Sequence, residues 1–299
     1  MISKKSGHIA VLSANIIYGA NYAIAKEVMP EYIGPFAFIF LRVAGAVLLF
    51  FTASLFIKEK MESKDIRKCF MLALFGVAIN QLLFFKGLSI TSPVNAALMM
   101  TTNPVQVLII AWILLGERIT LQKSAGIVLG LCGALLLILL SDYQSEHEAS
   151  FAGDLMVFIN SLSWAAFIVM VKPLMMKYHP VTVMKWVFLS GLILVSPFGI
   201  SEFQEARFSE LTPYLWLHVA FVVVATTFIA YLLNVSALKT LSPTVVSYYI
   251  YLQPLLAALF GIFFGYGSPQ WQHALSAALI FAGVYLVSIS NKRRMESKT

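Results

Sequence analysis

Long hydrophobic runs separated by short polar connections dominate the sequence. Each run has about 20 residues, the length with which an α-helix crosses the hydrocarbon core of a membrane. The runs are continuous and do not alternate apolar with polar residues, which favours helices over a β-barrel. The predicted spans number ten and cover residues 8–28, 34–57, 68–88, 92–115, 121–141, 152–172, 181–201, 212–237, 243–265 and 270–290.

Two stretches of the chain, 91–137 and 241–287, repeat three landmarks at one spacing. Each pair of landmarks is separated by 150 residues: Pro93 and Pro243, Pro104 and Pro254, Gly133 and Gly283. Self-similarity at a fixed spacing indicates an internal duplication. We therefore predict two repeats, residues 1–145 and 146–299.

The predicted repeats would cross the membrane in opposite directions, because each holds an odd number of spans. Two further pairs, Tyr18 with Trp164 and Lys26 with Lys172, are each 146 residues apart (164−18, 172−26). Inverted repeats of this kind are typical of secondary transporters. The predicted fold is an all-α integral membrane protein with ten transmembrane helices in two inverted five-helix repeats.

Composition and charge agree with a membrane protein. Of the 299 residues, 60% are hydrophobic and 12% are charged, whereas soluble proteins have about a quarter charged. With a cytoplasmic N-terminus, 17 of the 21 Lys and Arg residues fall on one side of the membrane. The positive-inside rule then predicts that both termini are cytoplasmic, in the inner membrane of a bacterial cell. The net charge of +7 forms no contiguous basic face, so no nucleic-acid partner is expected.

The fourth and ninth predicted spans each hold a proline after an amide, Asn103-Pro104 and Gln253-Pro254. Proline removes a backbone donor and frees a carbonyl one turn back, which a membrane tolerates where protein or a water-filled cavity meets it. The prolines indicate either a pair of kinked helices lining a cavity or simple structural kinks. In the first case Pro104 and Pro254 would face each other across that cavity.

Polar side chains gather in the first, third, fourth, sixth, eighth and ninth predicted spans. Each can bind a substrate or can join two helices by a hydrogen bond. Thr102 and Gln106 share a helical face at i and i+4. The candidate substrate-binding residues are Asn15, Tyr18, Tyr22, Asn80, Gln81, Thr102, Asn103, Pro104, Gln106, Asn160, Trp164, Thr227, Tyr231, Tyr248, Tyr251, Gln253 and Pro254.

Two charged residues are candidates for a gating or structural role. Arg42 lies within the second span, where a charge either serves a function or reaches back to the interface. Glu117, beside Arg118, follows the fourth span, where it can gate, form a local ion pair or contact the helix end.

Motifs for catalysis are missing from the sequence. It holds no P-loop, no HExxH and no usable Ser-His-Asp set, and no metal or cofactor is expected. We predict that the protein is not an enzyme. Its acidic residues lie near span ends, which favours facilitated flux or exchange over strict proton coupling.

One set of residues forms a recognisable pattern: Tyr18-Gly19, Asn21, Arg42 after Pro35, Pro93, Ala96-Ala97, Pro104, Leu115-Gly116-Glu117-Arg118, Gln122, Gly126, Gly130 and Gly133. This pattern resembles the EamA family of the drug/metabolite transporter superfamily, over essentially the whole chain. It departs at Gly267-Ser268, where a second Glu-Arg-like pair is often found. The resemblance implies ten helices, a central cavity built by helices 1–4 and 6–9, peripheral helices 5 and 10, and transport, often export, of amino acids or other small metabolites.

The predicted function is secondary transport by alternating access around a central cavity. The solute would be a small metabolite such as an amino acid, moved in the export direction. The alternative is a membrane-embedded structural, regulatory or lipid-handling protein that does not transport. The expected partners are the solute and the lipid bilayer, and the chain would be a monomer or a homodimer.

Overall fold

The computed structural model describes residues 4–26, 28, 32–91, 93–139, 150–263 and 271–296. Regular structure in these ranges is helical. The first half holds α1 (Lys4–Lys26), α2 (Pro35–Ser54), α3 (Ser63–Ala73), α4 (Asn80–Leu88), α5 (Pro93–Met100), α6 (Asn103–Leu115) and α7 (Leu121–Leu139). The second half holds α8 (Phe151–Lys177), α9 (Pro180–Glu205), α10 (Pro213–Phe221), α11 (Ala230–Ala237), α12 (Pro243–Tyr248), α13 (Leu252–Phe263) and α14 (Trp271–Glu296).

Nine helical segments of the described chain are long and apolar enough to cross a membrane. They correspond to nine of the predicted spans. The first predicted span corresponds to α1, a helix of 23 residues that is not among these nine. The all-helical membrane architecture is confirmed, and the count of ten spans stays a prediction.

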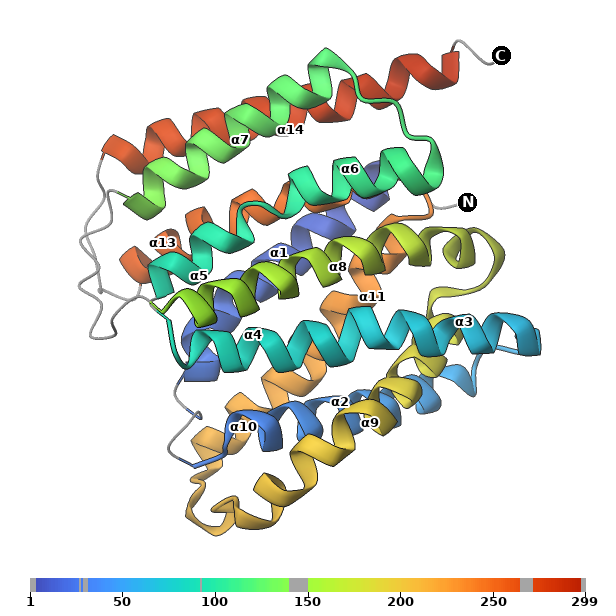
Figure 1. The fold of residues 1–299 in the computed structure, drawn as a ribbon, viewed down its shortest axis with the longest axis vertical. Coiled ribbons are helices and arrows are strands. Elements are labelled where there is room, and N and C mark those ends of the chain that lie inside the picture. Colours follow the sequence, from blue (N-terminus) through green and yellow to red (C-terminus); the bar gives the residue numbers. More distant parts are fainter. Residues whose placement is uncertain are drawn as a thin grey trace.

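The helices form a bundle in which two pairs lie at opposite edges (Figure 1). α7 packs against α14 at one edge, and α2 packs against α9 at the other. Between them, α8 contacts α4, α5 and α6, while α1 contacts α11 and α13. The start of α1 and the end of α14 lie on the same side of the bundle (Figure 1).

Glycines allow the α7–α14 pair to approach closely. A Cβ atom at Gly126 would lie 2.8 Å from the Gly283 carbonyl oxygen, and one at Gly133 would lie 3.0 Å from that of Ser276. Small residues at such points are typical of packed membrane helices.

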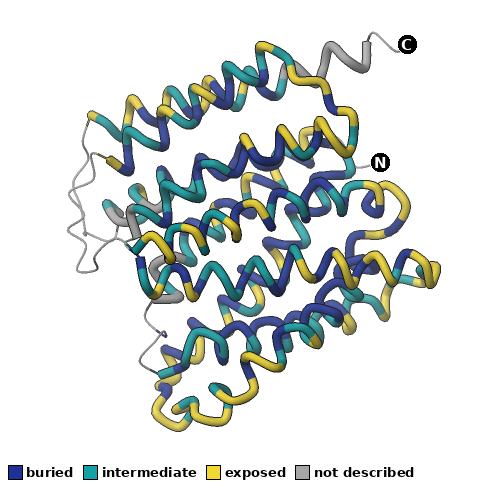
Figure 2. The backbone as a smooth tube through the Cα atoms, in the orientation of Figure 1, coloured by how far each residue is buried: buried dark blue, intermediate teal, exposed yellow. Residues whose placement is uncertain are grey.

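The apolar core lies in the middle of the bundle and extends to the α2–α9 pair (Figure 2). Phe50 of α2 is fully buried, and its ring centroid lies 5.1 Å from that of Phe188 and 4.6 Å from that of Phe228. Large apolar side chains are exposed on outward faces, such as Trp112 and Ile113 of α6. Such faces suit a lipid environment, where apolar exposure has no hydrophobic cost.

Four of the spans are interrupted helices. α5 ends before a turn at Thr101 and Thr102, and α6 then begins at Asn103. α12 passes through a 3₁₀ turn, Tyr249–Tyr251, into α13. α3 is joined to α4, and α10 to α11, by the π-helical segments Leu74–Ile79 and Val222–Ile229. A π-helical turn inside a helix is rare and is frequently found at a functional site.

Candidate functional site

The two π-helical segments lie near the middle of the third and eighth spans and supply carbonyl groups to the interior. A π turn disturbs the regular backbone hydrogen bonds, so its carbonyl groups need other donors. The Thr227 hydroxyl donates to the Val222 carbonyl at 2.8 Å, and the Ser163 hydroxyl of α8 donates to the Phe75 carbonyl at 2.6 Å. The Tyr231 hydroxyl donates to the Gly76 carbonyl at 3.3 Å. The carbonyl groups of both π segments are therefore satisfied by side chains of the second half of the chain.

Arg42 of α2 projects into the bundle beside the second π segment. Its side chain is buried, with 5% exposed, and its Nε donates to the Thr227 hydroxyl oxygen at 3.0 Å. The guanidinium carbon lies 5.3 Å from the ring centroid of Phe85 and 6.0 Å from that of Phe38. Aromatic faces attract a cation, which offsets part of the cost of removing it from water. Arg42 thus points inward and does not reach back to the membrane interface.

Tyr231 joins α11 to the third span and to α8. Its hydroxyl oxygen accepts a hydrogen bond from Gln81 Nε2 at 3.3 Å. The Trp164 and Phe188 rings pack edge-on to the Tyr231 ring, with centroids 5.3 and 5.2 Å away. We define the central polar cluster as Arg42, Gln81, Thr227 and Tyr231.

Tyr18 of α1 borders the central polar cluster. Its side chain lies near Asn234 of α11, and it interacts electrostatically with Arg42 and Tyr231. The predicted residues Tyr18, Gln81, Trp164, Thr227 and Tyr231 are therefore brought together around Arg42. The side chain of Tyr22 lies outside the described residues.

A second polar contact joins α6 to α8. Asn103 Nδ2 donates to the Ser161 carbonyl at 2.7 Å, and the Ser161 hydroxyl donates to Gln106 Oε1 at 2.9 Å. Gln106 Nε2 donates to the Thr102 hydroxyl at 3.0 Å, which confirms that these two residues share a face. Pro104 is buried in the first turn of α6.

The corresponding contact in the other half joins α13 to α1. Gln253 Nε2 donates to Asn15 Oδ1 at 3.0 Å. The two contacts have the same spacing as the sequence repeats, because Gln253 follows Asn103 by 150 residues (253−103) and Ser161 follows Asn15 by 146 (161−15). Ser161 was missing from the predicted site, although this arithmetic could have identified it. Pro254 is only partly buried, and its predicted position opposite Pro104 stays a prediction.

Buried amide side chains in the interior leave some of their oxygen atoms without a hydrogen-bond donor. Asn80 and Asn160 each donate through Nδ2 to the other's backbone carbonyl, at 3.5 and 2.6 Å. The side-chain oxygens of Asn160, Gln81 and Asn103 are buried and accept no hydrogen bond from a described residue. A buried acceptor without a donor costs about 1–3 kcal/mol. The described interior thus holds three spare acceptors, one of which, Gln81 Oε1, belongs to the central polar cluster.

Tyr248 and Tyr251 lie elsewhere than in the predicted central lining. The Tyr248 hydroxyl donates to the Ile280 carbonyl of α14 at 3.2 Å. A Cβ atom at Gly130 would meet the Tyr248 hydroxyl at 2.1 Å and the Tyr251 ring at 2.5 Å. Both tyrosines therefore pack against the α7–α14 pair, because the glycines of that pair leave room for their rings.

Glu117 forms a local ion pair, one of the three alternatives predicted for it. Its carboxylate accepts a hydrogen bond from Lys123 Nζ at 2.5 Å, and both side chains are buried. Lys123 also donates to the Arg118 carbonyl at 3.2 Å. The preceding Gly116 has a φ of 60°, a left-handed conformation that glycine adopts without strain where a helix ends. The Gly-Glu-Arg motif therefore shapes the turn between α6 and α7.

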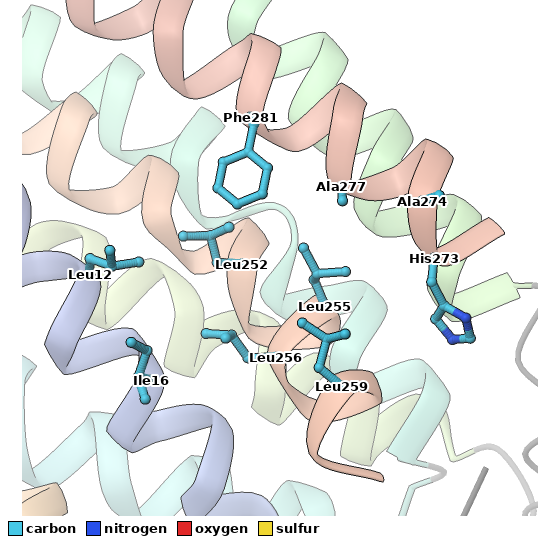
Figure 3. A pocket seen from close by; sticks show the side chains of 10 residues that line it. All are labelled: Leu12, Ile16, Leu252, Leu255, Leu256, Leu259, His273, Ala274, Ala277 and Phe281. Carbon is cyan, nitrogen blue, oxygen red and sulfur yellow. The ribbon is translucent and has the colours of Figure 1, made fainter. Parts of the chain in front are cut away.

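A cavity of about 290 Å³ lies between α1, α13 and α14 (Figure 3). Leu12, Ile16, Leu256, Leu259 and Phe281 point toward it, and none of the predicted substrate-binding residues lines it. Its apolar lining suits a hydrocarbon chain better than a polar solute.

The sequence matches the profile of the EamA-like transporter family over residues 5–139 and again over residues 151–289. The chain belongs to the EamA-like transporter family. The uncharacterized transporter YyaM of Bacillus subtilis is 25% identical over 287 residues, covering 94% of this chain and 93% of that protein. An uncharacterized transporter of Archaeoglobus fulgidus is also 25% identical, over 288 residues that cover 94% of this chain and 96% of that protein. A protein of known crystal structure, 17% identical in sequence, superposes with a TM-score of 0.81. The match covers 97% of this chain and 99% of that protein's chain.

Family membership and geometry together define what this EamA-like transporter is. It is a multi-pass integral membrane protein that serves as a transporter and not as an enzyme. The crystal structure shares its fold over nearly the whole length. The match of the family profile to both halves agrees with the internal spacing of the polar contacts. In this setting the central polar cluster is the candidate solute site.

Proposed function

We propose that this EamA-like transporter is a secondary transporter that exports small metabolites such as amino acids by alternating access. The observation that carries the proposal is the central polar cluster, in which Arg42 bonds Thr227 and Gln81 bonds Tyr231. Each bond joins a residue of the first half to a residue of the second half. A site shared between two halves changes its exposure when the halves rock against each other.

The proposed architecture consists of ten spans in two inverted repeats, residues 1–145 and 146–299. It is supported by the two family-profile matches and by the matching contacts Asn103–Ser161 and Gln253–Asn15. We further propose a bacterial inner-membrane location with both termini cytoplasmic, in agreement with the loop charges. The proposed assembly is a monomer or a homodimer.

The test is counterflow in liposomes that contain the purified full-length protein. Liposomes loaded with one unlabelled amino acid should accumulate the same labelled amino acid from outside, at a rate above protein-free liposomes. Arg118→Gln changes an exposed residue and serves as the matched control with unchanged flux. If no solute in a broad panel of amino acids and other metabolites shows counterflow, the proposal fails.

The coupling of transport is tested in the same liposomes. In the described spans the buried acidic side chains are those of Asp65 and Glu117, near span ends and paired with lysines. We propose facilitated flux or exchange because no described acid lies beside the central polar cluster. An imposed pH gradient should change the initial rate of solute uptake by no more than about twofold. Strong acceleration of uptake by the gradient would overturn the proposal of facilitated flux or exchange.

The apolar cavity favours one alternative, a lipid-handling protein. A hydrocarbon chain would fit between α1, α13 and α14. Transfer of a fluorescent phospholipid between the leaflets of the same liposomes, without counterflow of any metabolite, would support this alternative.

A further inference from the structure

Arg42 differs from the other buried charged residues of the described chain in its partners. Asp65 accepts hydrogen bonds from Lys68, Lys177 and Tyr178, and Glu117 is paired with Lys123. In the part of the chain that the structure describes, no carboxylate lies within ion-pair distance of Arg42. Its two terminal nitrogens also form no hydrogen bond with a described residue.

An uncompensated cation inside a membrane protein is costly. Burying a charge without an opposite charge costs far more than burying a paired one. The Phe38 and Phe85 rings and the Thr227 hydroxyl meet only part of the guanidinium. The guanidinium plane presents several N–H groups in a fork that matches a carboxylate. No described residue supplies Arg42 with a carboxylate, and a bound solute can supply one.

We propose that Arg42 binds the carboxylate of the transported solute. This inference rests on the proposed transport function and names the class of solute for the same site. The carboxylate would receive hydrogen bonds from the terminal nitrogens of Arg42, while Nε keeps its bond to Thr227. The apolar part of the solute would lie against the aromatic rings that surround Arg42 and Tyr231.

Charge counting favours a carboxylate over a phosphate monoester. Two other lysines whose side chains lie inside the bundle are already engaged: Lys123 pairs with Glu117, and Lys172 donates to the carbonyls of Leu238 and Leu241. One guanidinium neutralises one carboxylate, whereas a phosphate monoester carries close to two negative charges at neutral pH. A phosphate would thus leave an uncompensated negative charge in the same interior.

The amide oxygen of Gln81 extends the argument to the other end of an amino acid. This oxygen is buried and has no donor among the described residues, while Nε2 of the same amide donates to the Tyr231 hydroxyl. An ammonium group carries three donors and no acceptor, so an amide oxygen suits it. The Arg42 guanidinium and the Gln81 amide oxygen therefore lie around one aromatic side chain, that of Tyr231. They match the carboxylate and the ammonium group of an amino acid.

The experiment compares matched pairs of solutes on the purified full-length protein. The probes are L-phenylalanine, L-leucine and L-alanine, their three carboxamides, and phenyl phosphate, with thermal stabilisation as the binding measurement. We expect at least one acid to bind about 100-fold more tightly than its amide, because losing one partner of a buried charge pair has an effect of this size. Counterflow of that acid should be lost in Arg42→Gln and retained in Arg118→Gln.

Arg42→Lys keeps the positive charge and decides the matter if Arg42→Gln does not fold. It should retain binding of the acid, weakened about 10-fold through loss of the fork geometry, and should keep the preference for acid over amide. Equal affinity for acid and amide, wild-type affinity in Arg42→Gln, or binding of phenyl phosphate in preference to every acid would overturn the inference.

The outcomes also separate this inference from the proposed function. Counterflow of neutral or cationic solutes without any carboxylate would overturn the role of Arg42 and leave the transporter proposal intact. Absence of counterflow for every metabolite would overturn both. A wild-type protein that binds no acid of the three pairs would overturn the inference.

Discussion

Arg42 and Phe188 occupy corresponding positions in the two proposed repeats, yet one is charged and the other apolar. They are 146 residues apart (188−42), as are Gly45 and Gly191 (191−45). Arg42 bonds Thr227, whereas Phe188 is fully buried against Phe50 and Tyr231.

The backbone packing around these two positions is the same. A Cβ atom at Gly45 would lie 2.5 Å from Val223 Cγ1, and one at Gly191 would lie 2.6 Å from Val77 Cγ1. The two valines are again 146 residues apart (223−77). Helix packing is therefore retained in both halves while the chemistry has diverged, so the interior presents its positive charge from one side.

The largest effect is expected from Phe188→Arg, which places the charge in both halves. A second buried cation without an acid should lower the free energy of unfolding by about 3–5 kcal/mol or prevent folding. Denaturant unfolding in detergent micelles, followed by circular dichroism, measures this. Phe188→Met is the control and should cost less than about 1.5 kcal/mol. A stable Phe188→Arg protein would show that the interior tolerates charge generally.

The reverse change, Arg42→Met, should remove function without loss of stability. Replacing a buried charge by an apolar side chain of similar size is often neutral or stabilises by about 1–4 kcal/mol. The same unfolding measurement, combined with counterflow, checks both parts. Marked destabilisation together with normal counterflow would assign Arg42 a structural role.

Alanine at Gly45 and at Gly191 tests the shared packing. Each Cβ atom would overlap a valine, and overpacking costs about 1–3 kcal/mol. We expect equal losses of stability for the two variants in unfolding experiments. Clearly unequal losses would contradict the correspondence of the two positions.

Asn103→Ala and Gln253→Ala compare the two matching polar contacts. Asn103 is fully buried and donates twice to Ser161, so its loss should cost about 1–2 kcal/mol. Gln253 is partly buried, and the loss of its bond to Asn15 should cost about 0.6 kcal/mol. The opposite order in the unfolding free energies would contradict this ranking.

The smallest effect is expected at Glu62, in the connection between α2 and α3. Hydrogen bonds from Lys177 and then Lys64 hold the pKa of the Glu62 carboxyl below its ordinary value. A lowered pKa adds stability above the ordinary pKa, and this contribution is lost as the pH falls through the lowered pKa. The melting temperature of Glu62→Gln should therefore approach that of the wild type in acid and fall slightly below it at neutral pH. A constant difference across this pH range would contradict the assignment.

The sequence was sufficient to predict nine of the spans as long helices, because lipid demands long apolar runs. The predicted run 181–201, for example, lies within α9, Pro180–Glu205. The π segments could not be predicted, since Leu74–Ile79 is apolar throughout and its backbone hydrogen bonds depend on Ser163 and Tyr231 from distant helices.

The candidate site was predicted less completely than the fold. Polar residues within the predicted spans suggested Gln81 and Tyr231, which are in contact. The same criterion suggested Tyr248 and Tyr251, because polarity alone does not show which face of a helix meets a neighbour. The glycines of α7 and α14 decide that question, and only the assembled bundle brings them opposite these tyrosines.

The π segments also change the direction in which side chains point along two of the spans. One additional residue turns the following part of a helix by about 100°. In the third span, α3 packs on α9, and α4, after the π segment, packs on α8. In the eighth span, the π segment packs on α2, and the following α11 packs on α1. The α2–α9 pair thus contacts the rest of the bundle through the third and eighth spans. Each of these spans changes its packing partner at its π segment.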